Sequence, residues 1–218
     1  FLTSPSFAAF PAWIEQLIAE STGKDGTGVL PVAGEVPGDP EAYGDDRVFV
    51  SLALAGEDTG GLDAFAAAME TAGHPVIRIE TDRPEGLAAE MYRAEIATAM
   101  AGAVLGIHPF DQPDVQAAKV LAKQAMAGEL EAGAIREVAA DGDELPSAVG
   151  GLLESVRTGD YLAIQAFLAP TPEVEEALQR FRHLARDRLQ VATTLGFGPR
   201  FLHSTGQAYK GGPNSGVF

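Results

Sequence analysis

The sequence predicts an α/β fold: a three-layer αβα sandwich with a mainly parallel sheet. Three observations predict it. Apolar runs of strand length recur along the chain, at 47–54, 75–82, 160–168 and 191–198. Helical patterns separate the first run from the second and the third from the fourth, and a strand, a helical crossover and a second strand form a βαβ unit with parallel strands. The 218 residues, 46% of them hydrophobic, can bury a sizeable core.

Charge and cysteine content exclude several classes of partner and site. The formal net charge is −16, whereas binding to nucleic acid or to an anionic membrane requires a basic surface. The chain has no cysteine, which excludes disulfides and thiolate metal sites. Charged residues or glycines interrupt the apolar runs before they reach membrane-spanning length, and the first twenty residues lack the basic segment of a signal peptide. We therefore expect a cytoplasmic protein with neither nucleic acid nor membrane as a partner.

The stretch 13–24, WIEQLIAESTGK, predicts a short amphipathic helix with a carboxylate near its end. Residues four apart give it an apolar stripe, made of Trp13, Ile14, Leu17 and Ile18. Gln16 and Glu20 share a neighbouring polar face, and Gly23 stands where a left-handed helix-ending residue belongs. A carboxylate at that end opposes the helix dipole and, if it is removed from water, is suited to act as a general base. The alternative is an ordinary surface glutamate on an amphipathic helix.

The segments on either side of this helix suggest a domain boundary at residue 46. The first ten residues predict an extended segment and a turn, and Pro11 stands near the helix start. A loop rich in glycine, proline and aspartate follows at 25–46, and a loop of this length is usually functional or covers a surface. We expect residues 1–46 to be the end of a preceding domain that carries the catalytic glutamate, and residues 47–218 to form the α/β domain.

Apolar periodicity predicts further helices at 60–73, 86–107, 114–126 and from 172 onward. The segment 86–107 is apolar over most of its circumference, which predicts a helix buried inside the domain. The segment 127–160 is rich in charge and is expected to be solvated surface with a weak helix around 148–157. Thr171 and Pro172 are typical of a helix cap and a first helical residue.

Three strings of the sequence resemble one enzyme family. They are AESTGK at 19–24, GIHPFDQPDVQAAK at 106–119 and GPRFLHSTGQAYKGGP at 198–213. The first two are similar, in the same order, to segments of glucose-6-phosphate isomerases. The first and third look most like the isomerase part of bacterial transaldolase/glucose-6-phosphate isomerase fusion proteins. The resemblance implies a sugar-isomerase (SIS) domain that interconverts glucose 6-phosphate and fructose 6-phosphate through a cis-enediol, without a metal ion or other cofactor.

The resemblance also implies roles for particular residues. In the family a glutamate passes a proton between C1 and C2 of the sugar, and Glu20 occupies its position here. The lysine that closes the second string lies near the ring oxygen, so Lys119 is expected to assist ring opening. Without the family motif, Lys119 would be interpreted as a solvated helix lysine. Substrate-binding residues are expected at Gln16, Lys24, Gln112 and Gln207, although Gln112 and Asp111 are also suited to shaping the loop and capping the next helix.

The ring-opening histidine of the family is expected at His203. Typical members carry it between the glutamate and the lysine, in a string that ends in G-Q-H or D-Q-H, but His74 and His108 lack this context. The string STGQAYKGG is similar, although Ala208 stands where a histidine would follow Gln207. His203 directly precedes this string. The alternative for such a single histidine is a hydrogen-bonded structural residue.

The phosphate-binding loop of the family has no counterpart in the sequence. It is a Ser/Thr-rich string upstream of the glutamate, and no S-x-T-T-x-E string occurs. We therefore expect the C-terminal portion of a longer isomerase, whose partners are a sugar phosphate, the missing N-terminal SIS or transaldolase portion and, in a homodimer, a second copy. The alternative is a regulatory SIS domain that binds sugar phosphates without catalysis. A nucleotide-binding domain is disfavoured because no G-x-G-x-x-G or G-x-x-x-x-G-K-[ST] string follows a strand.

Overall fold

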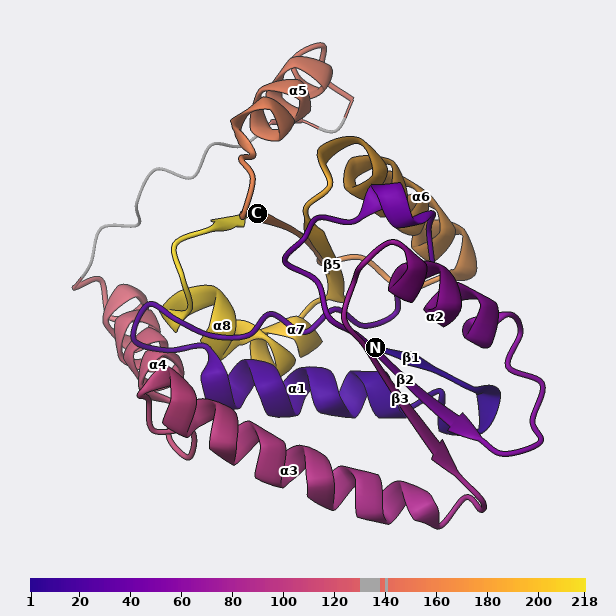
Figure 1. Ribbon diagram of the computed structural model, residues 1–218. Coiled ribbons are helices and arrows are strands. Elements are labelled where there is room, and N and C mark those ends of the chain that lie inside the picture. The colour runs from indigo at the N-terminus through magenta and orange to yellow at the C-terminus, as the bar shows by residue number, and fades with distance from the viewer. Residues whose placement is uncertain (130–137, 140) are drawn as a thin grey trace.

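The chain has the predicted α/β fold, and the strands paired in its sheets run parallel (Figure 1). The computed structural model describes residues 1–129, 138, 139 and 141–218. Within these residues the strands form two three-stranded sheets. The first has the order β1-β2-β3, from Leu2–Thr3, Phe49–Leu54 and Val76–Thr81. The second has the order β5-β4-β6, from Ala192–Phe197, Tyr161–Ala166 and Gly216–Val217.

The helices follow the predicted order. α2 (Leu62–Thr71) connects β2 to β3 and α6 (Pro172–Leu189) connects β4 to β5, which confirms both βαβ units. The hydroxyl of Thr171 accepts a hydrogen bond from the Val174 N–H at 3.4 Å and caps α6 as predicted. The remaining helices are α1 (Phe10–Thr22), α3 (Gly86–Leu105), α4 (Pro113–Met126), α5 (Leu145–Ser155), α7 (Arg200–Ser204) and α8 (Gly206–Gly211), with the 3-10 turns η1 (Pro5–Phe7) and η2 (Pro40–Ala42).

The two sheets differ from the single open sheet that the strand pattern suggested. β6 pairs with only two residues of β4, and β1 with only two residues of β2. The segment 28–34 runs between the sheets: the amine of Phe1 donates to the Val32 carbonyl at 3.0 Å, and Val32 packs against a core cluster that includes Tyr161. Pro31 in this segment has no N–H to donate, so the segment is poorly suited to form a ladder that would join the sheets.

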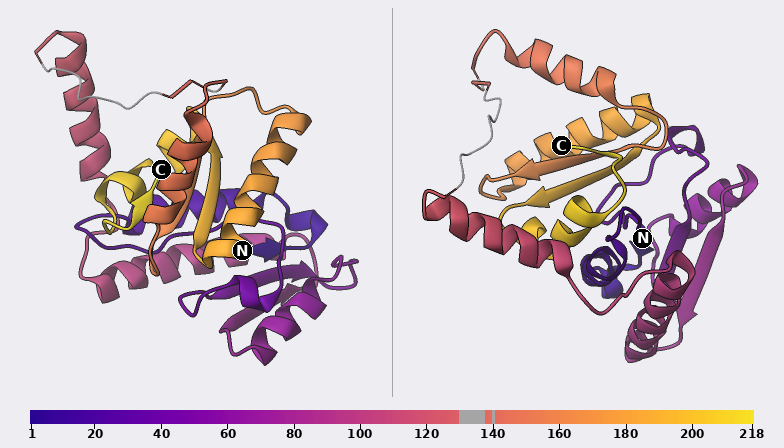
Figure 2. Two further views of the ribbon diagram at one scale, coloured as in Figure 1. Left: turned by 90° about the horizontal axis from the view of Figure 1, so that it is seen from above. Right: turned by 90° about the vertical axis from the view of Figure 1, so that its left-hand side faces the viewer.

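α1 lies at the centre of the molecule (Figures 1 and 2). Its residues Phe10 and Ile14 are buried in one cluster with Phe7 and with Leu52 of β2. α3 covers this cluster from the other side with Leu87, Met91 and Ala94. α1 also contacts α7 and α8, which come from the last part of the sequence. The helix that carries Glu20 is therefore held from both halves of the chain.

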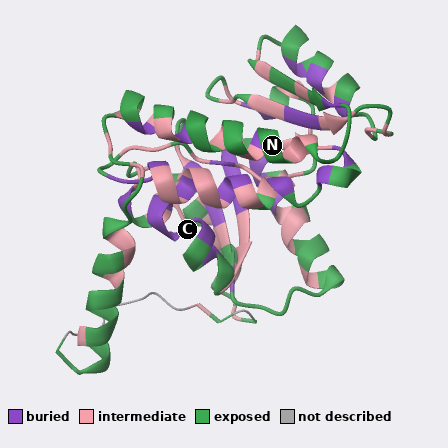
Figure 3. Ribbon diagram, turned by 90° about the horizontal axis from the view of Figure 1, so that it is seen from below, coloured by how far each residue is buried: buried purple, intermediate pink, exposed green. Residues whose placement is uncertain are grey.

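The prediction that the segment 86–107 is buried inside the domain is wrong for one of its faces. The inner face of α3 packs on α1, but the outer face exposes Tyr92, Ile96, Met100 and Val104. A helix that is apolar over most of its circumference gives no indication of which face is covered, and this explains the error. α4 has no buried residue, and Figure 3 shows it extending from the rest of the molecule. None of the described helices, α3 included, is long and apolar enough to cross a membrane.

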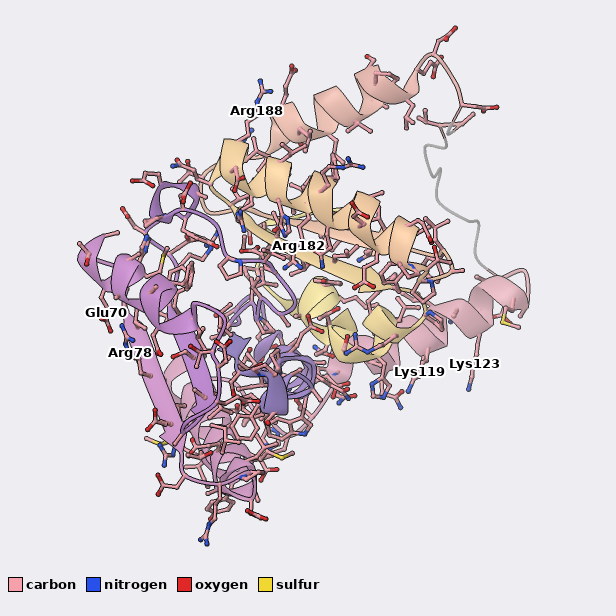
Figure 4. All side chains as sticks on the ribbon, turned by 90° about the vertical axis from the view of Figure 1, so that its right-hand side faces the viewer. Glu70, Arg78, Lys119, Lys123, Arg182 and Arg188 are labelled. Atoms are coloured by element: carbon pink, nitrogen blue, oxygen red, sulfur yellow. The ribbon has the colours of Figure 1, made fainter. Side chains whose placement is uncertain are left out.

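Two buried arginines of α6 attach the segment 33–36 to the second sheet. Arg182 is 1% exposed and lies on the side of α6 that faces the strands (Figure 4). It donates hydrogen bonds to the carbonyls of Ala33 at 3.2 Å, Gly34 at 3.1 Å and Thr193 at 2.7 Å. The carboxylate of Glu35 lies 3.7 Å from Arg182 and 3.2 Å from Arg186. The first loop and β5 are thereby joined through α6.

Candidate active site

Three of the predicted site residues meet on one side of α1. The amide nitrogen of Gln16 lies 3.3 Å from Glu20 Oε2 and 3.0 Å from His203 Nδ1. The same imidazole nitrogen is 3.8 Å from Glu20 Oε1. Gln16 and Glu20 belong to α1, whereas His203 belongs to α7, which packs against α1. The fold therefore brings a carboxylate and an imidazole together across most of the sequence.

These contacts determine the orientation of the Gln16 amide and the tautomer of His203. An ionised carboxylate only accepts hydrogen bonds, so the nitrogen of Gln16 must face Glu20. The same nitrogen faces Nδ1 of His203, so Nδ1 accepts a hydrogen bond and the proton of the neutral ring is assigned to Nε2. Gln16 thus holds both groups and directs a donor N–H of the imidazole away from itself.

The surroundings leave the pair accessible from one side. The side chain of Glu20 is 17% exposed and that of His203 is 76% exposed. His203 is anchored through its neighbour Phe201, which is buried against β5. A Cβ atom at Gly196 of β5 would lie 2.6 Å from the Cβ of Phe201, so only glycine lets α7 approach this closely. His203 is therefore largely open to solvent, whereas Glu20 is only partly exposed.

A second carboxyl group of α1, that of Glu15, is buried and was not found from the sequence. Glu15 is 9% exposed, and burial raises the pKa of its carboxyl above the ordinary value, while Arg200 and Arg182 act in the opposite direction. α1, which carries Glu15, packs against α7 and α8.

Lys24 lies inside the protein at the end of α1. Its side chain is 1% exposed, and its ammonium donates to the carbonyls of Asp111 and, at 2.9 Å, His108. It also forms an ion pair with the Asp111 carboxylate at 3.1 Å. These partners belong to the string GIHPFDQPDVQAAK, so Lys24 attaches this segment to α1. Direct contact between Lys24 and a substrate stays a prediction.

Gly23 ends α1 as predicted, but in a different conformation. Its φ of −79° is not left-handed. The position requires glycine for another reason: a Cβ atom there would lie 2.2 Å from the Cα of Ala208. α8 therefore packs directly on the end of α1.

Gln207 of α8 is also buried, with 0% of the residue exposed. Its amide nitrogen donates to the Gly23 carbonyl at 2.9 Å and to the Asp114 carboxylate at 2.6 Å. Its amide oxygen accepts from the Val115 N–H at 3.2 Å. The nitrogen and the oxygen of this amide both have partners within the protein. Substrate contact at Gln207 stays a prediction that these contacts do not test.

Lys119 and Gln112 lie on the surface. Gln112 is the residue before α4, and Lys119 follows in its first turns. Both are exposed. Figure 4 shows Lys119 and Lys123 along α4, and within the described residues neither forms an ion pair. Lys119 is thus connected to Glu20 only indirectly, through the segment that Lys24 and Gln207 hold.

Curated proteins named glucose-6-phosphate isomerase are similar to this chain. The protein of Rubrobacter xylanophilus is 33% identical over 144 residues, which cover 50% of this chain and 33% of that protein. The protein of Enterococcus faecalis is 28% identical over 151 residues, which cover 53% of this chain and 34% of that protein. A protein of Haloarcula marismortui named probable glucose-6-phosphate isomerase is 29% identical over 154 residues, with 56% and 35% covered.

The similarity is limited in extent. The matched region spans about a third of the length of these relatives. No family model matches the chain, and no solved structure matches it. None of these relatives is named as a transaldolase, so the fusion context stays a prediction.

The other histidines do not join the cluster of Gln16, Glu20 and His203. His74 packs edge-on against Phe49 with ring centroids 5.4 Å apart, and burial lowers the pKa of His183 on α6. The ring of His108 is exposed, and only its backbone carbonyl contacts Lys24. Among the four histidines, His203 is therefore the one placed beside Glu20.

A cavity of about 520 Å³ lies elsewhere, between the two sheets, and Glu20 does not line it. Most of its wall is apolar. Four of its charged residues form two ion pairs, one between Arg186 and Glu35 and one between Arg47 and Asp46. We consider the site at Glu20 the better candidate because a carboxylate, an amide and an imidazole meet there. In the described part of the chain, no group of three His, Asp or Glu side chains is arranged to hold a metal ion.

Proposed function

We propose that this chain is the C-terminal portion of a glucose-6-phosphate isomerase and carries its proton-transfer base. The observation that carries the proposal is the contact of Glu20, Gln16 and His203, residues that lie up to 187 positions apart. The similarity to proteins named glucose-6-phosphate isomerase supports it.

Glu20 is the proposed base for the movement of hydrogen between C2 and C1. Its carboxylate takes the C2 proton of open-chain glucose 6-phosphate, the C–H electrons form the C1–C2 double bond of a cis-enediol, and O1 gains a proton. Return of a proton to C1, with loss of the O2 proton, gives fructose 6-phosphate. Gln16 keeps the carboxylate oriented by its hydrogen bond at 3.3 Å. A positioned base of this kind contributes roughly 10²–10⁴-fold to the rate.

Ring opening is the proposed task of His203 and Lys119. It requires that O5 gain a proton as the C1–O5 bond breaks and that the O1 hydroxyl lose one. The ammonium of Lys119 is proposed to give its proton to O5 and become the neutral amine, while water takes the O1 proton and returns it to that amine. The Nε2–H of His203 is proposed to donate a hydrogen bond to O5, because Nδ1 faces Gln16. Gln112 is proposed to contact the sugar from the loop before α4. The phosphate of the sugar is proposed to bind the N-terminal portion of the parent protein.

The test of the base is Glu20→Gln in the full-length parent protein. Production of fructose 6-phosphate is measured by a coupled assay, and binding of the sugar phosphate by calorimetry. Turnover should fall roughly 10²–10⁴-fold while binding is retained, because glutamine keeps the shape but not the basicity. Glu175→Gln, at an exposed position of α6, is the matched control. Turnover of Glu20→Gln close to that of the control would refute the assignment.

Ring opening is tested with two kinds of substrate. Lys119→Ala and His203→Gln should slow glucose 6-phosphate much more than a shorter aldose phosphate that stays in the open-chain form. Equal slowing of both substrates would remove these residues from ring opening. If the wild-type parent binds sugar phosphates but does not isomerise them, the regulatory alternative is correct instead.

A further inference from the structure

The amide of Gln207, on α8, links the end of α1 to the start of α4, and the proposed reaction needs these two helices in a fixed relative position. It donates to the carbonyl of Gly23, which ends the helix of Glu20. It also donates to the Asp114 carboxylate and accepts from the Val115 N–H, both in the first turn of α4. Lys119 follows on α4 about one turn later. One buried side chain thus links the end of α1 to the start of the helix that carries Lys119.

The geometry of these contacts favours glutamine at this position. The amide supplies two N–H donors and one acceptor, and each has a partner here. The contact to Asp114 is charge-assisted and measures 2.6 Å, which makes it the shortest of the three. A glutamate would place a second carboxylate against Asp114, and an apolar residue would leave the Gly23 carbonyl without this donor.

Lys24 supplies a second link between the same two parts. Its buried ammonium donates to the carbonyl groups of His108 and Asp111 and pairs with the Asp111 carboxylate at 3.1 Å. These residues directly precede α4. Gln207 therefore holds the first turn of α4, while Lys24 holds the loop that leads into it.

Close packing leaves little room around the Gln207 amide. A Cβ atom at Gly211 would lie 2.0 Å from Asp114 Oδ2 and 2.8 Å from the Gln207 nitrogen. A Cβ atom at Gly23 would collide with Ala208. Glycine at both positions lets α1, α4 and α8 meet without an intervening side chain. The Gln207 amide is thereby enclosed, with 0% of the residue exposed.

We propose that Gln207 is a positioning residue that, with Lys24, sets the placement of Lys119 relative to Glu20. The inference rests on the proposed isomerase function, because that function places both Lys119 and Glu20 at the sugar. Displacement of a reacting group by about 1 Å costs on the order of 10²-fold in rate. Loss of the Gln207 contacts should therefore lower kcat with little change in KM.

The first experiment measures activity in the full-length parent protein. Gln207→Met should lower kcat roughly 10²-fold, with KM within about threefold of wild type, and should slow glucose 6-phosphate more than an open-chain aldose phosphate. Gln207→Glu should be at least as slow because its carboxylate faces Asp114. Adding Asp114→Asn to Gln207→Glu should raise kcat about tenfold above that of Gln207→Glu alone, because the new amide at 114 donates a hydrogen bond to the carboxylate at 207. Failure of this second substitution to restore activity contradicts the positioning role.

The second experiment measures the geometry without relying on activity. The chain has no cysteine, so Ala12→Cys on α1 and Lys123→Cys on α4, both exposed, can carry two spin labels. Pulsed EPR on wild type should give one narrow distance distribution, and Gln207→Met should broaden or shift it. An unchanged distribution overturns the inference even if the wild type is an active isomerase. Gln207→Met broadening the distribution, while the wild-type parent has no isomerase activity, would support the link between the helices and refute the proposed function.

Discussion

Replacement of Arg182 by leucine tests the argument that a buried guanidinium holds the segment 33–36 to the second sheet. Arg182→Leu removes the donors that face the carbonyls of Ala33, Gly34 and Thr193. It also removes one of the two arginines that face Glu35, although Arg186 remains at 3.2 Å. Leucine replaces part of the buried volume but none of the hydrogen bonds.

The expected cost follows from the groups that are left behind. Removing one partner of a buried ion pair typically destabilises a protein by about 3–5 kcal/mol, and each buried carbonyl that loses its donor contributes about 1–3 kcal/mol to such a loss. We therefore expect the free energy of unfolding to fall by about 3–5 kcal/mol. At about 2–4 °C per kcal/mol for a domain of this size, the melting temperature should fall by roughly 6–20 °C.

Arg188→Leu is the matched control on the same helix, because Arg188 is exposed (Figure 4). It should change the free energy of unfolding by no more than about 0.5 kcal/mol. Urea unfolding followed by circular dichroism, together with thermal melting, gives both values. If Arg182→Leu proves no more destabilising than Arg188→Leu, the interpretation of the Arg182 contacts is wrong.

Three further predictions concern other parts of the fold. Gly23→Ala should destabilise the protein by about 1–3 kcal/mol or more in urea unfolding, because its Cβ would meet Ala208 at 2.2 Å. Gly150→Ala in α5, where an added Cβ would have no atom within 4 Å apart from its own stretch of helix, should be neutral or stabilising, and equal effects of the two changes would contradict the packing argument. Burial raises the folded-state pKa of Glu15 above 4.5, so its contribution to stability is present below that pH and is lost as the pH rises through the raised pKa. Glu15→Gln should therefore gain in melting temperature relative to wild type between pH 4.5 and pH 8, and a gain that shrinks with pH would refute this sign. Thr171→Ala should cost about 1 kcal/mol in urea unfolding through loss of the α6 cap, whereas Thr171→Ser should cost much less; identical losses would show that the hydroxyl does not cap.

Local patterns in the sequence were sufficient to predict the order of the main strands and helices. Apolar runs and helix-start signals such as Thr171 act over a few residues, and the structure has the corresponding elements. The face shared by Gln16 and Glu20 is also a consequence of helical spacing alone. Their hydrogen bond at 3.3 Å follows from that spacing.

Features that depend on distant packing could not be predicted in this way. A lysine directly after a helix-ending glycine is usually exposed, but Lys24 is enclosed because the loop before α4 folds over it. Gln207 lies in a glycine-rich tail, where the sequence did not predict α8. Nothing local indicates which face of α3 is covered, or that the strands divide between two sheets.

The contact between Gln16 and His203 has a consequence for biosynthesis. Because the two residues are 187 positions apart, the ribosome must release nearly the whole of this chain before the imidazole can reach α1. A nascent protein can form α1 and β2 early, but it acquires the paired carboxylate and imidazole only when α7 docks. Any product shortened before residue 203 would therefore lack the contact between Gln16 and the imidazole.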